Sequence, residues 1–437
     1  MTATSEVISS ALVPRAACSL CRAPEQALRK VLGLRPSPLA NGLLTSPTDG
    51  ASRLPLDLVL CATCGHLQIG HVVDPEEAFS GYRYATGTTS PLTATRVRRQ
   101  AGEMLTELGL DEDGRRPVVV EVGSNDGTLL AAFQELGCVV QGIDPAREVA
   151  ASAIAAGVPT EVGFLGAEVA SRVLGRVGPA DLVVAHNVLA HGPDVLGMLI
   201  ACRYMMGPRA DLVIEVAHAL DLVRDLAFDT IYHEHYSYHA LGPLKRAIEA
   251  VGLVVMDAAR DSSQVGRGSL RVLASMPSSM EPSSSVEELL AVERDQGLTE
   301  ALTWNGLHHE VAGWTLDARA RVRAWRGRGL VAGFGAPAKM ATLTSQIADA
   351  ERGLPSVVDF TVDESSWKQG LFDPVSRAPI CGPDELHRRA PPACIIFAWN
   401  FAEDIMRRHA SYPGTFIVPL PRWREYPLVL RQMEGLA

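Results

Sequence analysis

The densest group of chemically capable side chains in this sequence lies in FDTIYHEHYSYHAL, residues 228–241. It holds three histidines, three tyrosines and a glutamate, although aromatic residues make up only 5% of the chain. Such side chains can move protons, bind a metal or form a polar stretch of surface. The H-E-H spacing lacks the two histidines four residues apart that place two metal ligands on one helical face. Proton transfer is therefore the preferred interpretation, with a metal site and a polar surface as alternatives.

The backbone conformation decides which of these side chains meet. If residues 231–236 are extended, His233 and His235 share one face, and Tyr232 and Glu234 share the other. If they form an irregular turn, this constraint disappears. A histidine has an ordinary pKa of about 6.5 and is a competent base near neutral pH. Other histidines of the chain are interpreted as surface or structural residues: His239, His308 and His309.

A second cluster consists of two Cys-x-x-Cys pairs, Cys18 with Cys21 and Cys61 with Cys64. Each pair can supply two thiolates from one tight turn, and four thiolates complete the tetrahedral shell of structural zinc. Such a shell leaves no open position, so the predicted Zn²⁺ stabilises the fold and takes no part in catalysis. A redox dithiol is the alternative. The remaining cysteines are expected to be buried small residues: Cys138, Cys202, Cys381 and Cys394.

A third motif, VVVEVGSNDGTLL (118–130), combines a buried strand with a glycine-containing turn and a helix start. Glycines at this crossing allow a ligand to approach the backbone at the carboxyl end of a strand. The pattern resembles motif I of class I S-adenosylmethionine-dependent methyltransferases and lacks the G-x-G-x-x-G spacing of nicotinamide-binding proteins. The next strand ends in an acid suited to the ribose hydroxyls. The predicted cofactor-binding residues are Glu121, Gly123, Asn125, Asp126, Gly127, Asp144, His186 and Asn187.

These motifs require an α/β framework. At roughly 150 residues per domain, 437 residues suggest about three domains. We predict a zinc-binding module over residues 1–80, a methyltransferase domain over 81–250 and a second Rossmann-like domain over 251–437. The middle region alternates strands and helices, as expected for a parallel, doubly wound sheet. The same alternation restarts at GLVAGFGAPAK (329–339).

The composition excludes several classes of protein. The chain is 47% hydrophobic and 21% charged, as in soluble globular proteins. A formal charge of -10 argues against nucleic acid as a partner. No stretch approaches the roughly 18 apolar residues of a membrane span. The first residues lack the basic start and apolar run of a signal peptide, so we expect a cytoplasmic protein, and a monomer is favoured.

Along nearly its whole length the chain resembles the C-methyltransferases that act on TDP-linked 4-keto deoxysugars in antibiotic biosynthesis. The resemblance rests on the order of the cysteine pairs, EVGSNDGTLL, NVLAH, DTIYHEHYSY, GSLRV, GFGAPAK, KQGLFDP and AWNFAEDI. It implies methylation of carbon 3 of a TDP-4-keto-2,6-dideoxysugar, with S-adenosylmethionine as methyl donor. The sugar nucleotide would lie between the last two domains. Methylation at another position or of another nucleotide-linked ketosugar, epimerisation, and a pure binding module are the alternatives.

The resemblance also assigns roles. His235 is the predicted general base that removes the proton alpha to the ketone. Glu234 and Tyr232 orient it, relay its proton or stabilise the enolate, and His191 binds the keto oxygen or a sugar hydroxyl. A substrate-facing tyrosine is Tyr84 or, in another register, Tyr82, with Tyr84 preferred. Further candidates for binding the sugar nucleotide are Lys339, Lys368 and Asn400.

The chain departs from the family pattern in its C-terminal half. Gly266 and Arg267 replace a histidine and a glycine, MATLTSQ (340–346) replaces a Gly-, Asn- and Thr-rich stretch, and Trp367 precedes KQG. We expect these departures to lie in the sugar pocket. The cofactor motifs are unchanged, so the methyl donor is better defined by the sequence than the sugar.

Overall fold

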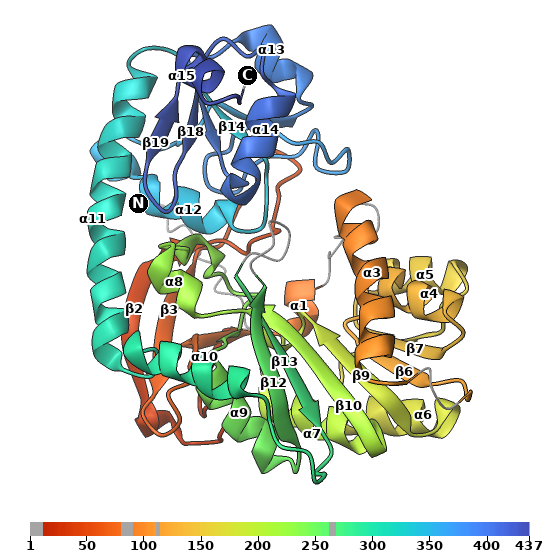
Figure 1. The fold of residues 1–437 in the computed structure, drawn as a ribbon. Coiled ribbons are helices and arrows are strands. Elements are labelled where there is room, and N and C mark those ends of the chain that lie inside the picture. The colour runs from red at the N-terminus through yellow and green to blue at the C-terminus, as the bar shows by residue number, and fades with distance from the viewer. Residues whose placement is uncertain (1–11, 80–90, 111–113, 262–267, 437) are drawn as a thin grey trace.

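The computed structural model describes residues 12–79, 91–110, 114–261 and 268–436, which form three packed domains (Figure 1). The N-terminal module is built on a four-stranded antiparallel sheet in the order β11-β4-β3-β2. In β3, alternate leucines point inward, as the sequence LPLDLVLC predicts for a half-buried strand. The edge strand β11 comes from the histidine-rich segment. The module contains β1 (Leu12–Pro14), β2 (Leu28–Ser37), β3 (Leu54–Cys61), β4 (Leu67–Ile69), β5 (His71–Val73), α1 (Pro75–Phe79) and β11 (Ser237–Tyr238).

The middle domain carries a seven-stranded sheet in the order β12-β13-β10-β9-β6-β7-β8. Its strands from β10 to β8 are parallel, and helices cover both faces, which explains why a strand such as VVVEV is a continuous apolar run. The strands are β6 (Val118–Val122), β7 (Val139–Asp144), β8 (Thr160–Val162), β9 (Ala180–His186), β10 (Met206–Ala217), β12 (Val254–Asp261) and β13 (Ser269–Ser275). The helices are α3 (Pro91–Glu107), α4 (Thr128–Glu135), α5 (Arg147–Ala155), α6 (Ala167–Val177), α7 (Val195–Met205), α8 (Leu220–Arg224) and α9 (Leu241–Ala250).

The predicted boundary at residue 250 divides this sheet and needs correction. Strands β12 and β13 lie beyond it, yet β13 pairs antiparallel with β10 on one side and with β12 on the other. The pairing satisfies the backbone along the edge of β10, which the sequence pattern left open. The α/β class is confirmed, with an antiparallel extension of the parallel sheet.

The C-terminal domain repeats the α/β plan on a smaller sheet. Its order, β16-β15-β14-β17-β18-β19, places the first strand of the domain at the centre, and only β19 is antiparallel. The strands are β14 (Val331–Phe334), β15 (Phe360–Val362), β16 (Ile380–Cys381), β17 (Ala393–Ile396), β18 (Thr415–Val418) and β19 (Arg424–Tyr426). The helices are α12 (Met340–Ile347), α13 (Asp384–Arg389), α14 (Ala402–Arg408) and α15 (Leu428–Met433), with the helical turn η5 (Trp399–Phe401).

Two helices, α10 (Ser284–Asp295) and α11 (Ala301–Arg326), connect the middle and C-terminal domains. The long α11 runs along the side of the molecule and contacts both β2 and α12 (Figure 1). One apolar core extends from β2 and β3 through α11 into the C-terminal sheet. The N-terminal module therefore shares its interior with a domain almost 300 residues later in the chain, as the core residues Leu32 and Val331 show.

Among the described residues, no helix combines the length and the apolar character needed to cross a membrane.

We predict that Trp304→Ala destabilises the protein strongly. Trp304 is fully buried in this shared core, and its indole N–H donates to the carbonyl of Leu298 at 2.9 Å. Removing the side chain leaves a cavity and an unpaired carbonyl, for which we expect a loss of about 3–5 kcal/mol in the free energy of unfolding. Urea unfolding measures the loss. The control is Leu302→Ala on the same helix, where the side chain is 79% exposed; equal losses in both variants would contradict the shared core.

Candidate functional site

The four cysteines of the N-terminal module converge as predicted. Their sulfur atoms lie within 4.8 Å of one another, with 3.6 Å between Cys18 and Cys64 and 3.7 Å between Cys21 and Cys61. Tetrahedral zinc with Zn–S bonds of about 2.3 Å requires sulfur atoms about 3.8 Å apart. These residues therefore fit a Zn²⁺ ion held by four thiolates, with no position left for a substrate. The guanidinium of Arg246 in α9 donates to the carbonyl of Cys64 and ties the cluster to the middle domain.

The turn after β6 has the backbone that close approach of a ligand requires. Gly123 and Gly127 have φ angles of +71° and +77°, and Asn125 between them has φ +53°. A Cβ at Gly123 would lie 2.8 Å from Val188, and one at Gly127 would lie 3.1 Å from Ala153 and Val158. The glycines are therefore fixed by both conformation and space. Asp126 accepts from the hydroxyl of Thr128 at 2.6 Å and closes the start of α4.

Two acids stand beside this turn, at the ends of neighbouring strands. Asp144, at the end of β7, accepts from the backbone N–H of Asn125 and of Ala146, both at 2.8 Å. Glu121 is 5% exposed, and one of its carboxylate oxygens has no hydrogen-bond partner among the described residues. Burial raises the pKa of both acids, and for Glu121 the nearby Asp144 adds to the rise. An unpaired buried acceptor beside a second carboxylate fits a ligand rich in hydroxyl and cationic groups, as S-adenosylmethionine is.

The turn after β6, residues 123–127, is here called the cofactor turn. The end of β9 leads to Val188, which packs against this turn at Gly123. His186 closes the strand, and burial lowers the pKa of its imidazole to about 4. Asn187 has φ +52°, and its backbone N–H donates to the carbonyl of Glu215. The carboxylate of Glu215 is paired with Arg96 at 2.9 Å. The sequence analysis missed Glu215, although its place at the end of the DLVIEVA strand matches that of the other strand-end acids.

Residues 228–239, here called the central strip, follow the irregular turn and not the extended alternative. The backbone N–H of His235 donates to the carbonyl of Tyr232, which folds residues 232–235 into a turn. The hydroxyl of Tyr232 therefore reaches the Nε2 atom of His235 at 2.7 Å. The imidazole of His233 points elsewhere and donates from Nε2 to the carbonyl of Pro55 at 3.1 Å. The turn therefore brings the side chains of Tyr232 and His235 together, and the side chains of His233 and His235 point in different directions.

The hydrogen bonds fix the tautomer of His235. Its Nδ1 lies 2.9 Å from the carbonyl oxygen of Thr230, which can only accept, so Nδ1 carries the proton. Nε2 then carries the lone pair and accepts from the hydroxyl of Tyr232. Burial, and then the nearby ring of His191, hold the pKa of His235 well below its usual range. His235 is therefore neutral at physiological pH, with its basic nitrogen on Tyr232.

His191 and Glu234 adjoin this pair. The Nδ1 atom of His191 donates to the backbone carbonyl of Glu234 at 2.9 Å, and its ring centroid lies 4.7 Å from that of His235. Burial lowers the pKa of His191 to about 4. The Glu234 side chain is 2% exposed, and burial raises its pKa to about 7. Its oxygens accept from the side-chain amide of Asn41, at 3.0 and 3.3 Å.

The predicted sugar-nucleotide residues lie near the other end of the central strip. The Nζ atom of Lys339 donates to the side chain of Asn400 at 3.0 Å and stands 3.9 Å above the ring of Trp399. It also lies 3.8 Å from a carboxylate oxygen of Asp229. Lys368 is paired with Asp363 at 3.3 Å and donates to the carbonyl of Ala336 at 3.0 Å, in the turn that leads to Lys339.

Asp229 is a site residue that the sequence analysis missed. It is fully buried, accepts from the indole N–H of Trp399 at 2.6 Å, and links the C-terminal domain to the central strip. Burial raises the pKa of its carboxyl, and the ammonium of Lys339 opposes the rise. Its position within DTIYHEHYSY was the available signal, since it is the first of the two acids in that string.

The departure MATLTSQ requires a correction, because it forms a packing element and does not line an open sugar pocket. All residues of α12 are buried. The hydroxyl of Thr342 donates to the carbonyl of Ile231 in the central strip at 2.7 Å, and Gln346 bonds the backbone of Arg35 in β2. The residues of this departure therefore support the central strip from behind by packing and hydrogen bonding. The predicted Tyr82 and Tyr84, and the departures Gly266 and Arg267, lie outside the described residues.

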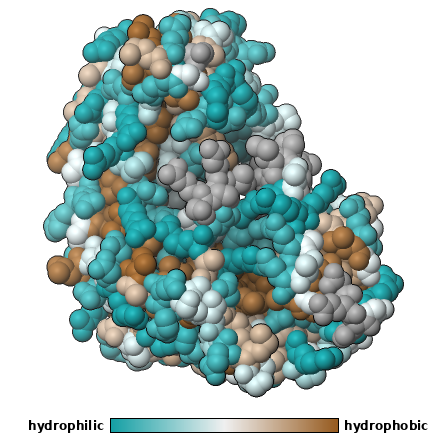
Figure 2. All heavy atoms as spheres, viewed as in Figure 1, coloured by the Kyte–Doolittle hydropathy of each residue, from teal (hydrophilic) through white to brown (hydrophobic). Residues whose placement is uncertain are grey.

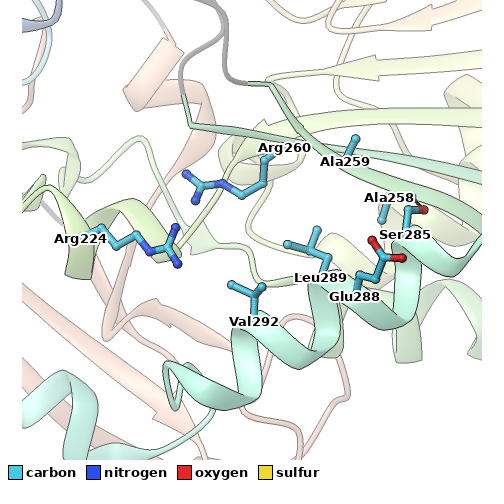
Figure 3. Close-up of a pocket in the computed structure, with 8 residues that line it drawn as sticks. All are labelled: Arg224, Ala258, Ala259, Arg260, Ser285, Glu288, Leu289 and Val292. Carbon is cyan, nitrogen blue, oxygen red and sulfur yellow. Dashed lines mark hydrogen bonds between the residues drawn. The ribbon is translucent and has the colours of Figure 1, made fainter.

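The surface is hollowed between the C-terminal domain and the α3 side of the middle domain, and hydrophilic residues gather on the walls of this hollow (Figure 2). A separate cavity of about 310 Å³ lies between α8, α10 and β12 (Figure 3). Arg224, Arg260 and Leu289 line it, and it contains none of the predicted site residues. The central strip and the cofactor turn therefore define the candidate site.

Comparison with known proteins finds similarity along most of the chain. Three family models match: a zinc-binding domain over residues 18–79, a methyltransferase domain over 94–258 and a C-methyltransferase C-terminal domain over 264–421. The C-methyltransferase NovU of Streptomyces niveus is 34% identical over 406 residues, which are 90% of this chain and 93% of that protein.

Among the solved structures that resemble part of the chain are two methyltransferases. Magnesium protoporphyrin IX methyltransferase of Synechocystis PCC 6803, with bound SAH, is 15% identical and covers 47% of this chain and 94% of its own, with a TM-score of 0.33. An S-adenosylmethionine-dependent methyltransferase of Mesorhizobium loti is 16% identical and covers 37% of this chain and 91% of its own, with a TM-score of 0.31.

We predict that Cys61→Ser removes the zinc. Loss of one thiolate leaves an incomplete tetrahedral shell, so zinc content should fall from about one ion per chain to near zero. The melting temperature should fall with it. Inductively coupled plasma mass spectrometry and thermal unfolding measure the two effects. Cys381→Ser, outside the cluster, is the control; full zinc retention in the Cys61 variant would refute the four-thiolate site.

We predict that Asp144→Asn weakens binding of S-adenosylhomocysteine. The variant keeps the size of the side chain but removes a charged acceptor, which costs about 1.5–3 kcal/mol, or roughly 10- to 150-fold in affinity. Isothermal titration calorimetry measures the change. Glu148→Gln on the exposed first turn of α5 removes the same charge nearby and should bind as the wild type does. Unchanged affinity in the Asp144 variant would exclude it from the cofactor site.

Proposed function

This chain belongs to the S-adenosylmethionine-dependent C-methyltransferases, and we propose that it methylates carbon 3 of a TDP-4-keto-2,6-dideoxysugar. The substrate position and the nucleotide rest on the family resemblance of the sequence motifs. Methylation at another carbon, or of another nucleotide-linked ketosugar, is the alternative. The enzyme uses S-adenosylmethionine, and the four cysteines hold zinc away from the chemistry.

The observation that best supports the proposal is the pairing of Tyr232 with His235. Carbon 3 of a 4-keto sugar has no lone pair, so its proton must leave before the carbon can act as a nucleophile. The pair presents one neutral imidazole lone pair and one phenolic O–H only 2.7 Å apart. From residue 231 to residue 240, only these two side chains are partly exposed, and the other residues are buried. The strip thus offers a base and a hydrogen-bond donor together.

In the proposed reaction, the substrate separates Tyr232 from His235. The Nε2 atom of His235 takes the proton from carbon 3, while its Nδ1–H remains bonded to the carbonyl of Thr230, which favours the imidazolium that forms. The hydroxyl of Tyr232 donates to the ketone oxygen as it gains enolate charge. S-adenosylmethionine supplies the electrophilic methyl group, which carbon 3 takes up as the ketone is restored.

The tautomer of His191 narrows its predicted role. Because its Nδ1–H donates to the carbonyl of Glu234, its Nε2 carries the lone pair, and a lowered pKa keeps the ring neutral. A neutral Nε2 lone pair accepts from a sugar hydroxyl and does not donate to a ketone oxygen. Of the two predicted roles of His191, we therefore favour binding of a sugar hydroxyl.

The position of Lys339 supports a substrate that reaches into both domains. Its ammonium lies beside Asp229, in the same strip as His235 and six residues before it. A diphosphate bound at Lys339 and Asn400 would bring negative charge close to the buried carboxyl of Asp229. Burial already raises the pKa of that carboxyl, and this added charge would favour its neutral form further. The indole of Trp399 offers a flat apolar surface at the same place. We propose that this group receives the nucleotide part of the substrate.

We predict that His235→Asn suppresses methyl transfer about 10²- to 10⁴-fold, the usual contribution of a general base. The variant should also lose exchange of the substrate's carbon 3 proton with deuterated solvent. Calorimetry should show unchanged affinity for S-adenosylhomocysteine. His309→Asn, exposed on α11, is the control. Full activity in the His235 variant would refute the base, and NMR of the product from the wild type decides which carbon carries the methyl group.

A further inference from the structure

We propose that Asn41, a residue of the zinc-binding module, is a positioning residue for the Glu234 carboxylate, which makes this module part of the active site. The inference rests on the proposed function, in which the central strip contacts the sugar. It concerns the Glu234 carboxyl, which the pairing of Tyr232 with His235 does not use.

The Glu234 carboxyl is enclosed but sparsely bonded. It is 2% exposed, and both of its oxygens accept from the same side-chain amide group of Asn41. In the described parts of the chain, no other side chain forms a hydrogen bond with this carboxyl. A buried carboxylate commonly needs several donors or a cation to stay ionised. Here a single neutral residue from another domain supplies the donor group.

Among the described residues, no cationic side chain is bonded to the Glu234 carboxyl, and the guanidinium of Arg15 donates instead to the backbone carbonyl of Tyr236. Tyr236, two residues after Glu234, is a neutral phenol whose pKa is raised by burial and by the nearby Glu234. From the other side, His191 contacts the backbone carbonyl of Glu234 and is neutral. Burial raises the pKa of Glu234 to about 7, and the backbone and side-chain N–H groups of Asn41 oppose the rise. Asn41 is therefore the main group that favours the ionised form.

The loop that carries Asn41 is held at both ends. It leaves the sheet after Ser37, at the end of β2. Beyond Asn41, the backbones of Leu44 and Phe372 exchange two hydrogen bonds of 2.9 Å, which fasten the loop to the C-terminal domain. Asn41 itself is exposed at its outer side while its amide reaches the buried carboxyl. The N-terminal module and the C-terminal domain thus hold the Asn41 amide in place, and the amide donates to the side chain of Glu234 in the central strip.

An amide suits this position better than a charged group. Lysine or arginine would hold the carboxyl ionised at every physiological pH, and a second acid would keep it protonated. The amide donates and leaves the charge near balance. A carboxylate held in this way can accept from a hydroxyl of the sugar and orient it in front of His235.

The test is the pH dependence of methyl transfer in Asn41→Ala. In the wild type, kcat/KM should fall as pH drops through about 7, because Glu234 becomes protonated. Loss of a hydrogen bond to a charged group should raise the apparent pKa of this acidic limb of the pH profile by about one pH unit or more. Activity at pH 7 should fall about fivefold or more and recover in alkaline buffer. Asn41→Gln, which keeps the amide, should restore the limb at least in part.

Two further variants keep the test decisive. Asn41→Asp has nearly the same size and should move the limb further upward than Asn41→Ala, because a second carboxyl opposes ionisation of Glu234. Thr45→Ala, in the same loop but bonded to Asp49, should leave the limb unchanged. Zinc content and S-adenosylhomocysteine affinity should be normal in all variants. A uniform loss of activity without a shift, or no change in Asn41→Ala and Asn41→Asp, would overturn the proposal.

A second readout does not depend on the substrate. The titration of Glu234 can be followed by NMR of protein with ¹³C-labelled glutamate side chains, with Glu234→Gln to assign the signal. Its pKa should be higher in Asn41→Ala than in the wild type. An equal pKa would overturn the positioning role even if the enzyme acts on another ketosugar. A shifted pKa without activity on the TDP-sugar would instead count only against the proposed substrate.

Discussion

The whole arrangement depends on burying a polar segment of twelve residues. The central strip carries histidines, tyrosines and two acids into the interior, and each buried polar group there needs a partner. The partners come from all three domains: Pro55 and Val73 from the N-terminal module, Ala190 from the middle domain, and Trp399 from the C-terminal domain. The domains are held around the strip because each one satisfies part of it. Tyr232 and His235 bond to each other instead and remain partly exposed.

The two α/β domains use the same local device for different ends. In both, an acid after the second strand accepts from the backbone N–H of the glycine turn that follows the first strand. In the middle domain Asp144 accepts from Asn125 at 2.8 Å, and in the C-terminal domain Asp363 accepts from Ala336 at 2.6 Å. In the second case the carboxylate is also paired with Lys368, whereas Asp144 is paired with no cation in the part of the chain that the structure describes. The first turn suits a cationic cofactor, and the second is closer to electrical balance.

The sequence predicted what depends on short-range patterns. Strand and helix periodicity gave the α/β class, and the Cys-x-x-Cys spacing gave the cysteine cluster, because residues close in sequence fix those features. It did not predict the ends of the domains, since the pairing of β13 with β10 and β12 depends on which backbone edges remain open after folding. Asn41 and Glu215 carry no motif of their own. Their partners lie 193 and 119 residues away, at Glu234 and Arg96, and only the tertiary structure brings them together.

The pairing of β11 with β4 has a consequence for how the chain reaches this structure. Next to this pairing, the imidazole of His66 and the hydroxyl of Ser237 form a hydrogen bond of 3.1 Å, although the two residues lie 171 positions apart in the sequence. While the polypeptide is being synthesised, the sheet of the N-terminal module has β4 at an open edge until the central strip has left the ribosome. Open edges invite pairing with other chains, and contacts so distant in sequence form slowly. Thiolate capture of zinc, which needs only the first 64 residues, can hold the early part of the module compact during this delay.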